Sequence, residues 1–138
     1  MPRLLLIVTV LSLLAFPGRA QEQVVVLGNV DDPQMRLQRS EVRNLFMGNL
    51  AREGLTPVVL PPAHPARVVF NTRVVGLTES RVQSYWAQMR FTGRAREPRE
   101  LRDIPQLLAY LQETPGAVGY VPAGEEIPEG LRVIYRSD

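Results

Sequence analysis

The chain alternates short apolar runs with segments whose apolar residues recur at helical spacing. Residues 23–29 and 56–60 contain continuous runs of β-branched residues, which predict two short strands buried on both faces. Residues 117–121 alternate small and large side chains and predict a strand whose small face admits close approach of a helix. Residues 131–135 predict a final, more exposed strand.

Helical spacing of apolar residues fills the intervals between these strands. Ser40, Thr78 and Asp103 precede three of the helical segments and are expected to be N-caps, because their side-chain oxygens can accept from free N–H groups of the first turn. Residues 66–77 predict a further helix, closed by Gly76 in the left-handed conformation. Strands separated by helices in this way predict an α/β fold with mostly parallel pairing through right-handed crossovers.

Two segments are expected to be loops. Residues 61–65, PPAHP, contain prolines that cannot donate to a strand ladder. Residues 94–100 mix arginine and glutamate, a pattern typical of a solvated surface. Tyr85 and Trp86 lie at the helical spacing of a buried stripe, so core packing is expected for them rather than stacking on a ligand.

The first 20 residues stand apart from this pattern. Arg3 precedes an apolar run at 4–16, and the small residues Gly18 and Ala20 then suit a signal-peptidase site before Gln21. This order predicts a cleavable Sec signal peptide at 1–20, with a retained anchor as the alternative, because the run is shorter than the roughly 20 apolar residues of a bilayer span. The mature domain is then expected at 21–138, periplasmic or secreted, with no membrane insertion after cleavage.

Charge and cysteine content narrow the class of protein. The chain has 16 basic residues, all arginine, against 14 acidic ones, and removal of Arg3 and Arg19 with the signal leaves a nearly neutral domain. A nucleic-acid partner is not expected, since such partners favour a basic stripe. No cysteine is present, so neither a lipid anchor on cysteine nor a disulfide can form.

The residues give no signature of catalysis. The chain has one histidine and no cysteine, so neither a Ser–His–Asp nor a Cys–His arrangement is indicated. No cluster has the spacing of metal ligands, and no glycine-rich phosphate loop is present. A binding protein without enzymatic activity, cofactor or metal is therefore expected.

Five sequence pieces follow one another in an order found in a known family. They are SEVRNLFMG at 40–48, PVVLPPAHPARVVF at 57–70, SYW at 84–86, FTG with a later proline at 91–98, and PGAVGYV at 115–121. In this order they resemble one lobe of the type 2 periplasmic solute-binding proteins, most closely the phosphate-binding components of ABC transporters and their short single-lobe relatives. The resemblance covers nearly all of the mature chain. It implies a three-layer, Rossmann-like α/β single lobe with a mostly parallel sheet.

The resemblance also implies a site for a small oxyanion such as phosphate. Relatives place glycine and hydroxyl residues before a helix that carries an arginine. This chain has proline, alanine, histidine and proline at 62–65, and only Arg67 matches the arginine by position. Arg67 and His64 are therefore the candidate ligand-binding residues. The alternative for Arg67 is an ion pair with a surface carboxylate, and for His64 a local structural role in the loop.

Two functions remain open at the level of sequence. In the first, the protein binds a small phosphate-like oxyanion without chemistry and serves an ABC permease or another envelope protein. In the second, it is a diverged adaptor domain that does not bind a small ligand. The adaptor would contact another envelope protein, or a second copy of itself as a homodimer, through the surface that a second lobe would cover.

Overall fold

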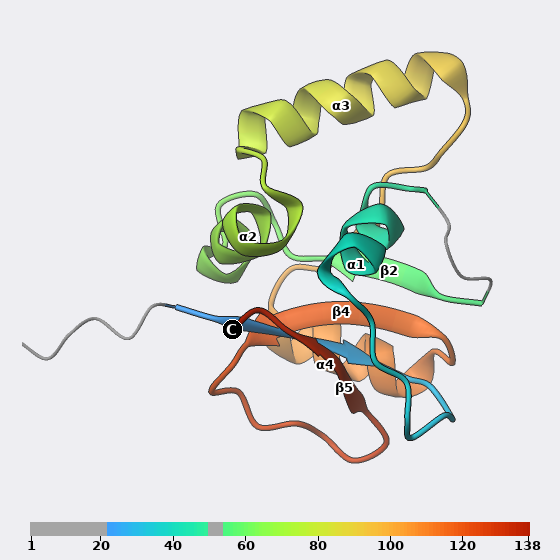
Figure 1. The fold of residues 1–138 in the computed structure, drawn as a ribbon, viewed down its shortest axis with the longest axis vertical. Coiled ribbons are helices and arrows are strands. Elements are labelled where there is room, and N and C mark those ends of the chain that lie inside the picture. The colour runs from blue at the N-terminus through green and yellow to red at the C-terminus, as the bar shows by residue number, and fades with distance from the viewer. Residues whose placement is uncertain (1–21, 50–53) are drawn as a thin grey trace, which may run out of the picture.

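The structure, a computed structural model, describes residues 22–49 and 54–138 and forms one α/β layer system (Figure 1). The predicted signal peptide at 1–20 lies outside these residues. The elements in chain order are β1 (Val24–Gly28), α1 (Arg39–Phe46), β2 (Thr56–Val59), α2 (Pro65–Phe70), the π-helical turn η1 (Asn71–Val75), α3 (Glu79–Thr92), β3 (Arg99–Glu100), α4 (Ile104–Glu113), β4 (Ala117–Pro122) and β5 (Arg132–Arg136).

The strands form one five-stranded sheet in the order β3-β2-β4-β1-β5. β2 runs parallel to β3 and to β4, as expected for strands joined through helical crossovers. β1 runs antiparallel to both of its neighbours, β4 and β5. The carboxyl ends of β2 and β4 therefore share one edge of the sheet with the amino end of β1.

Successive residues of β4 show which helices cover each face of the sheet. Gly119 faces Leu107 of α4, and a Cβ at that glycine would lie 3.1 Å from the Leu107 side chain. The next residue, Tyr120, points to the opposite face, where its ring stacks on Phe70 of α2 with the centroids 4.1 Å apart. Phe46 of α1 packs on the same two rings. The predicted three-layer α/β fold is confirmed, with α4 on one face and α1 and α2 on the other.

The core follows the apolar pattern of the sequence. Residues 24–27 of β1 are at most 2% exposed, as predicted for a strand covered on both faces. Trp86 is 2% exposed, and Tyr85 donates its hydroxyl to the carbonyl of Met47 at 2.6 Å. The prediction that these two aromatics belong to the core is confirmed.

Local signals located two of the three N-caps. Thr78 and Asp103 accept from the N–H groups of Arg81 and Gln106, at 3.3 and 2.9 Å. The third prediction, Ser40 as the N-cap of α1, was wrong. The helix begins at Arg39 with Gln38 as its N-cap, so Ser40 lies inside it. Glu41 accepts from the backbone N–H of Gln38 there, which starts the helix two residues early.

Two further segments differ from the sequence prediction. The expected helix at 66–77 is divided into α2 and the π-helical η1, in which the N–H of Gly76 donates to the carbonyl of Asn71. Gly76 closes it in the left-handed conformation, as predicted. The segment 94–100 was predicted to be a loop, yet Arg99–Glu100 forms the edge strand β3. Pairing with β2 produces this strand although its side chains are exposed and polar.

Candidate functional site

Arg67 lies in the first turn of α2, and its guanidinium points into the protein. The residue is 4% exposed, and it donates through Nε and Nη2 to the two carboxylate oxygens of Glu79. Nη1 donates to the carbonyl oxygen of Leu60 at 2.9 Å. Three guanidinium nitrogens are therefore already engaged by the chain itself, and the bidentate pair with Glu79 is the strong, planar form of this contact.

Glu79 is held by more than one donor. Asn71 Nδ2 donates to its Oε1 at 3.1 Å, and Gln83 Nε2 donates to its Oε2 at 2.9 Å. Burial raises the pKa of Glu79, but the hydrogen bonds from Arg67 and Gln83 and the charge of Arg67 together outweigh burial and leave the pKa below its ordinary value. The carboxylate is therefore anionic at neutral pH and neutralises Arg67.

His64 is the N-cap of α2. Its side-chain Nδ1 accepts from the backbone N–H of Ala66 at 3.1 Å, and its backbone N–H donates to the carbonyl of Pro61 at 2.9 Å. These two contacts fold the proline-rich loop back on itself and occupy the first free donor of the helix. The geometry thus gives His64 the local structural role that the sequence left open beside ligand binding.

A hollow separate from Arg67 and His64 opens at the sheet edge where β2 and β4 end. It has a volume of about 580 Å³, and neither Arg67 nor His64 lines it. We call it the carboxyl-edge hollow and define it by its nine lining residues. They are Glu22, Gln23, Val24, Pro65, Ala66, Val69, Pro122, Ala123 and Gly124.

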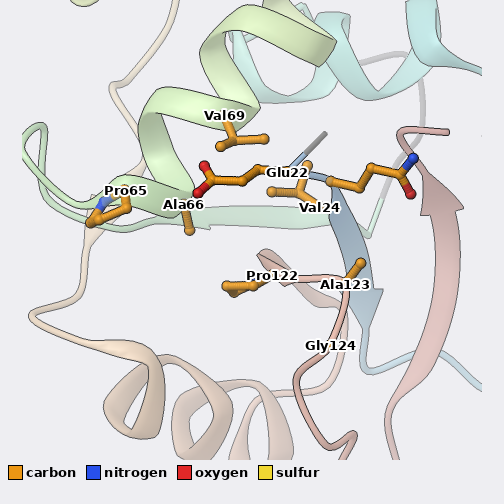
Figure 2. A pocket seen from close by; sticks show the side chains of 9 residues that line it. Glu22, Val24, Pro65, Ala66, Val69, Pro122, Ala123 and Gly124 are labelled. Carbon is orange, nitrogen blue, oxygen red and sulfur yellow. The ribbon is translucent and has the colours of Figure 1, made fainter. Parts of the chain in front are cut away.

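Three chain segments meet in the carboxyl-edge hollow (Figure 2). The first turn of α2 supplies one wall, the end of β4 and the following turn supply the second, and the residues at the start of β1 supply the third. Figure 2 shows the Glu22 side chain extending from β1 toward α2, with its carboxylate end near Ala66. The other lining residues are apolar or glycine except Gln23, so the hollow combines a mostly apolar wall with one neutral amide and one negative charge.

No sequence pattern predicts the carboxyl-edge hollow, although its member Pro65 belongs to the PPAHP loop. The lining residues at 65–69 and at 122–124 lie about 40 and about 100 residues after Glu22, and no local motif connects the three segments. One general rule points to the place: ligands of open α/β sheets bind at the carboxyl ends of adjacent parallel strands. Applying that rule requires knowing that β2 and β4 are neighbours, and only the folded sheet supplies that fact.

The described part of the chain contains neither a candidate metal site nor a candidate membrane-spanning helix. Residues 22–49 and 54–138 contain no group of three or more His, Asp or Glu side chains that could hold a metal ion. Within the same ranges, no helix has the length and apolar character to cross a membrane.

Comparison with known proteins adds information about the fold. No family model matches the chain, and no curated protein matches it significantly. Among solved structures, the chain is similar to an ABC-type phosphate transport receptor from Vibrio cholerae, with a TM-score of 0.62 and 15% sequence identity. The match covers 82% of this chain and 45% of the receptor, so the chain spans less than half of that receptor's length. The chain therefore has a periplasmic-binding-protein fold, as the resemblance implied.

Proposed function

We propose that the protein is a single-lobe, solute-binding-like adaptor that holds another envelope protein through the carboxyl-edge hollow. The observation that carries this proposal is the lining of the hollow, where mostly apolar residues accompany Glu22 and the neutral Gln23, and no arginine is present among the described lining residues. Such a surface favours an apolar side chain that has a positive charge beside it, as in a peptide segment with an aliphatic residue next to lysine or arginine.

The single lobe favours a protein partner over a small molecule. Small-molecule sites bury most of the ligand surface, whereas Glu22, Pro65, Ala123 and Gly124 leave this hollow open to solvent. The chain spans 45% of the transport receptor that shares its fold, and the described residues form one lobe of that size. A partner protein can supply the missing cover.

The competing proposal is phosphate binding, with Arg67 and His64 as ligands and an ABC permease as partner. It is supported by the position of Arg67 in the sequence and by the name of the phosphate transport receptor with the same fold. It requires Arg67 to release Glu79, and the loop at 61–65 has no Ser or Thr hydroxyl that could donate to a bound anion. Binding without chemical conversion is common to both proposals.

Thermal melting with phosphate separates the two proposals. Ligand stabilisation grows with the logarithm of ligand concentration over Kd, so the wild type is measured in increasing phosphate against chloride of equal ionic strength. We expect no rise in Tm beyond the chloride control. A rise shared by the wild type and Arg81→Ala, an exposed arginine of α3, but absent from Arg67→Ala, would replace the adaptor proposal with phosphate binding.

Site-specific photo-crosslinking tests the adaptor directly. A photoreactive residue at Ala123, inside the carboxyl-edge hollow, is compared with the same residue at Ala109, an exposed position on α4 at the other face of the sheet. In intact cells we expect one discrete adduct from position 123 and none from position 109. Identical adduct patterns from both positions, or no adduct from position 123, would contradict the proposal.

Export belongs to the same proposal. The sequence pattern at 1–20 and the fold shared with a transport receptor support a periplasmic location after cleavage before Gln21. Amino-terminal sequencing of the protein from a periplasmic fraction tests this and is expected to start at Gln21. A homodimer is the remaining alternative partner, and it would give an adduct of twice the chain mass in the crosslinking experiment.

A further inference from the structure

The carboxyl-terminal turn of α3 carries an exposed aromatic side chain among arginines. Phe91 is 95% exposed, and its neighbours in the sequence Arg90, Arg94 and Arg96 are exposed as well, as is Glu97 after them. From Arg81 to Arg96 the chain contains no aspartate or glutamate. We call Phe91 and these three neighbouring arginines the α3 tip.

The α3 tip lies away from the core. α3 is packed through Val82 and Trp86, which are 5% and 2% exposed, and Phe91 lies five residues beyond Trp86, on another side of the helix. Figure 1 shows α3 beyond α1 and α2, on the side away from the sheet, so that its last turn reaches the far end of the molecule. A flat surface can therefore contact the α3 tip without meeting the sheet.

We propose that the α3 tip docks on an anionic membrane surface. Phe91 enters the boundary between headgroups and acyl chains, while Arg90, Arg94 and Arg96 contact lipid phosphates. Charge complementarity selects this occupant: the tip is basic, although the mature domain as a whole is nearly neutral. Arginine also suits phosphate because its planar group donates two parallel hydrogen bonds.

The composition of the tip agrees with a lipid surface better than with an apolar protein groove. To fill an apolar groove on another protein, the tip would have to present several contiguous apolar side chains. The described residues expose three large apolar side chains, and Val68 and Ile127 belong to α2 and to the turn before β5, not to α3. One exposed aromatic ring with three exposed arginines within five residues of it in the sequence matches an interface in which an anionic layer covers an apolar one. The contact is peripheral and requires no spanning helix.

Fluorescence of Phe91→Trp tests this docking. The only native tryptophan, Trp86, is 2% exposed, so its emission is already that of a buried ring. In the exported protein we expect the emission from position 91 to shift to the blue with vesicles of equal parts phosphatidylglycerol and phosphatidylcholine. Pure phosphatidylcholine vesicles are expected to leave it unchanged. The matched control is Ala109→Trp at an exposed position of α4, and its emission is expected to show no shift with either vesicle.

Charge variants test the contribution of the arginines by vesicle co-sedimentation. Replacing Arg90, Arg94 and Arg96 with glutamine is expected to weaken binding to anionic vesicles roughly fivefold per arginine removed. The control replaces Arg36, Arg102 and Arg136, exposed arginines outside α3, and removes the same charge. Equal losses in both variants would show non-specific attraction and overturn the proposal.

Two other outcomes would also overturn it. Absence of binding to anionic vesicles by the wild type contradicts membrane docking outright. A dimer in sedimentation equilibrium that Phe91→Ser converts to monomer, without vesicle binding, would make a second copy of the chain the occupant of the tip. Circular dichroism of each variant confirms that its fold is retained, and the blue shift of Phe91→Trp is read on a folded protein.

Discussion

The carboxylate of Glu79 binds the guanidinium of Arg67 in a bidentate pair, with Oε2 2.9 Å from Nη2. Arg67 lies in the first turn of α2, and Glu79 is the first residue of α3. The pair therefore joins the first turns of two helices that are separated by η1 in the sequence. The Arg67 side chain is 5% exposed and that of Glu79 is 27% exposed. The chain thus provides its own anion at the position where the resemblance to solute-binding proteins implies an external one.

Glu79→Gln is expected to destabilise the protein by about 2 kcal/mol, because it removes the bidentate counter-charge of a buried guanidinium and leaves only the more distant Glu100 near Arg67. Partial exposure of the Glu79 side chain keeps the loss below that of a fully buried pair. Urea denaturation measures the change. The matched control is Glu100→Gln, which removes the second carboxylate near Arg67, 4.0 Å from Nη1 and 52% exposed. A loss below about 0.5 kcal/mol is expected there, and equal losses would contradict the assigned role of Glu79.

Stability at acid pH is expected to depend on Glu79. Its pKa in the folded protein lies below the ordinary value of 4.5, so the unfolded chain binds the proton more tightly. The stabilisation is therefore present above pH 4.5 and is lost as the pH falls through the folded pKa. Urea midpoints measured between neutral and acid pH are expected to fall less steeply in Glu79→Gln than in the wild type. Parallel curves would show that another carboxylate controls acid unfolding.

Gly116→Ala is expected to cost more than about 3 kcal/mol. Gly116 has φ +82°, and a Cβ on it would lie 2.2 Å from the carbonyl oxygen of Gly54, a contact that only backbone movement can relieve. Gly130→Ala is the matched control, because Gly130 has φ +87° but no atom within 4 Å of the added Cβ. The control measures the conformational cost alone, about 1 kcal/mol. Comparable losses in calorimetric unfolding would contradict the close approach of the two backbones.

Tyr120→Phe is expected to destabilise the protein by about 2 kcal/mol, because the buried N–H of Leu60 donates to the Tyr120 hydroxyl at 3.1 Å. Burial also raises the pKa of Tyr120 well above its ordinary value of 10.0. The neutral phenol therefore stabilises the fold below pH 10, and this contribution is lost at more alkaline pH. Tyr110→Phe on α4, a half-buried tyrosine, is expected to change stability by less than about 0.5 kcal/mol. Equal losses of stability in the two variants would mean that the hydrogen bond from Leu60 to Tyr120 does not stabilise the fold.

The elements of the fold could be predicted because their signals are local. The β-branched run at 24–27, the caps Thr78 and Asp103 and the left-handed Gly76 each act within a few residues of the structure they specify. The predicted start of α1 was wrong because Gln38 is the N-cap in place of Ser40, with Glu41 accepting from its backbone N–H.

The candidate site was less accessible from sequence. Arg67 was identified with an ion pair as one of its two interpretations, but its partner Glu79 was not, since no local rule sets the distance between two helices. Likewise β3 has no apolar pattern of its own and exists through its pairing with β2. The carboxyl-edge hollow requires three segments to meet, and each of them is unremarkable alone.

The amino-acid sequence by itself determined the α/β class, the buried strands and most helix ends, because hydrophobic periodicity and capping depend on neighbours in the chain. The tertiary structure alone decided that β1 runs antiparallel to its neighbours, that Glu79 neutralises Arg67, and that the open hollow carries a negative rather than a positive charge. These features depend on which distant segments pack together. That packing is set by the balance of burial and hydrogen bonding over the whole fold, which no single stretch of sequence contains.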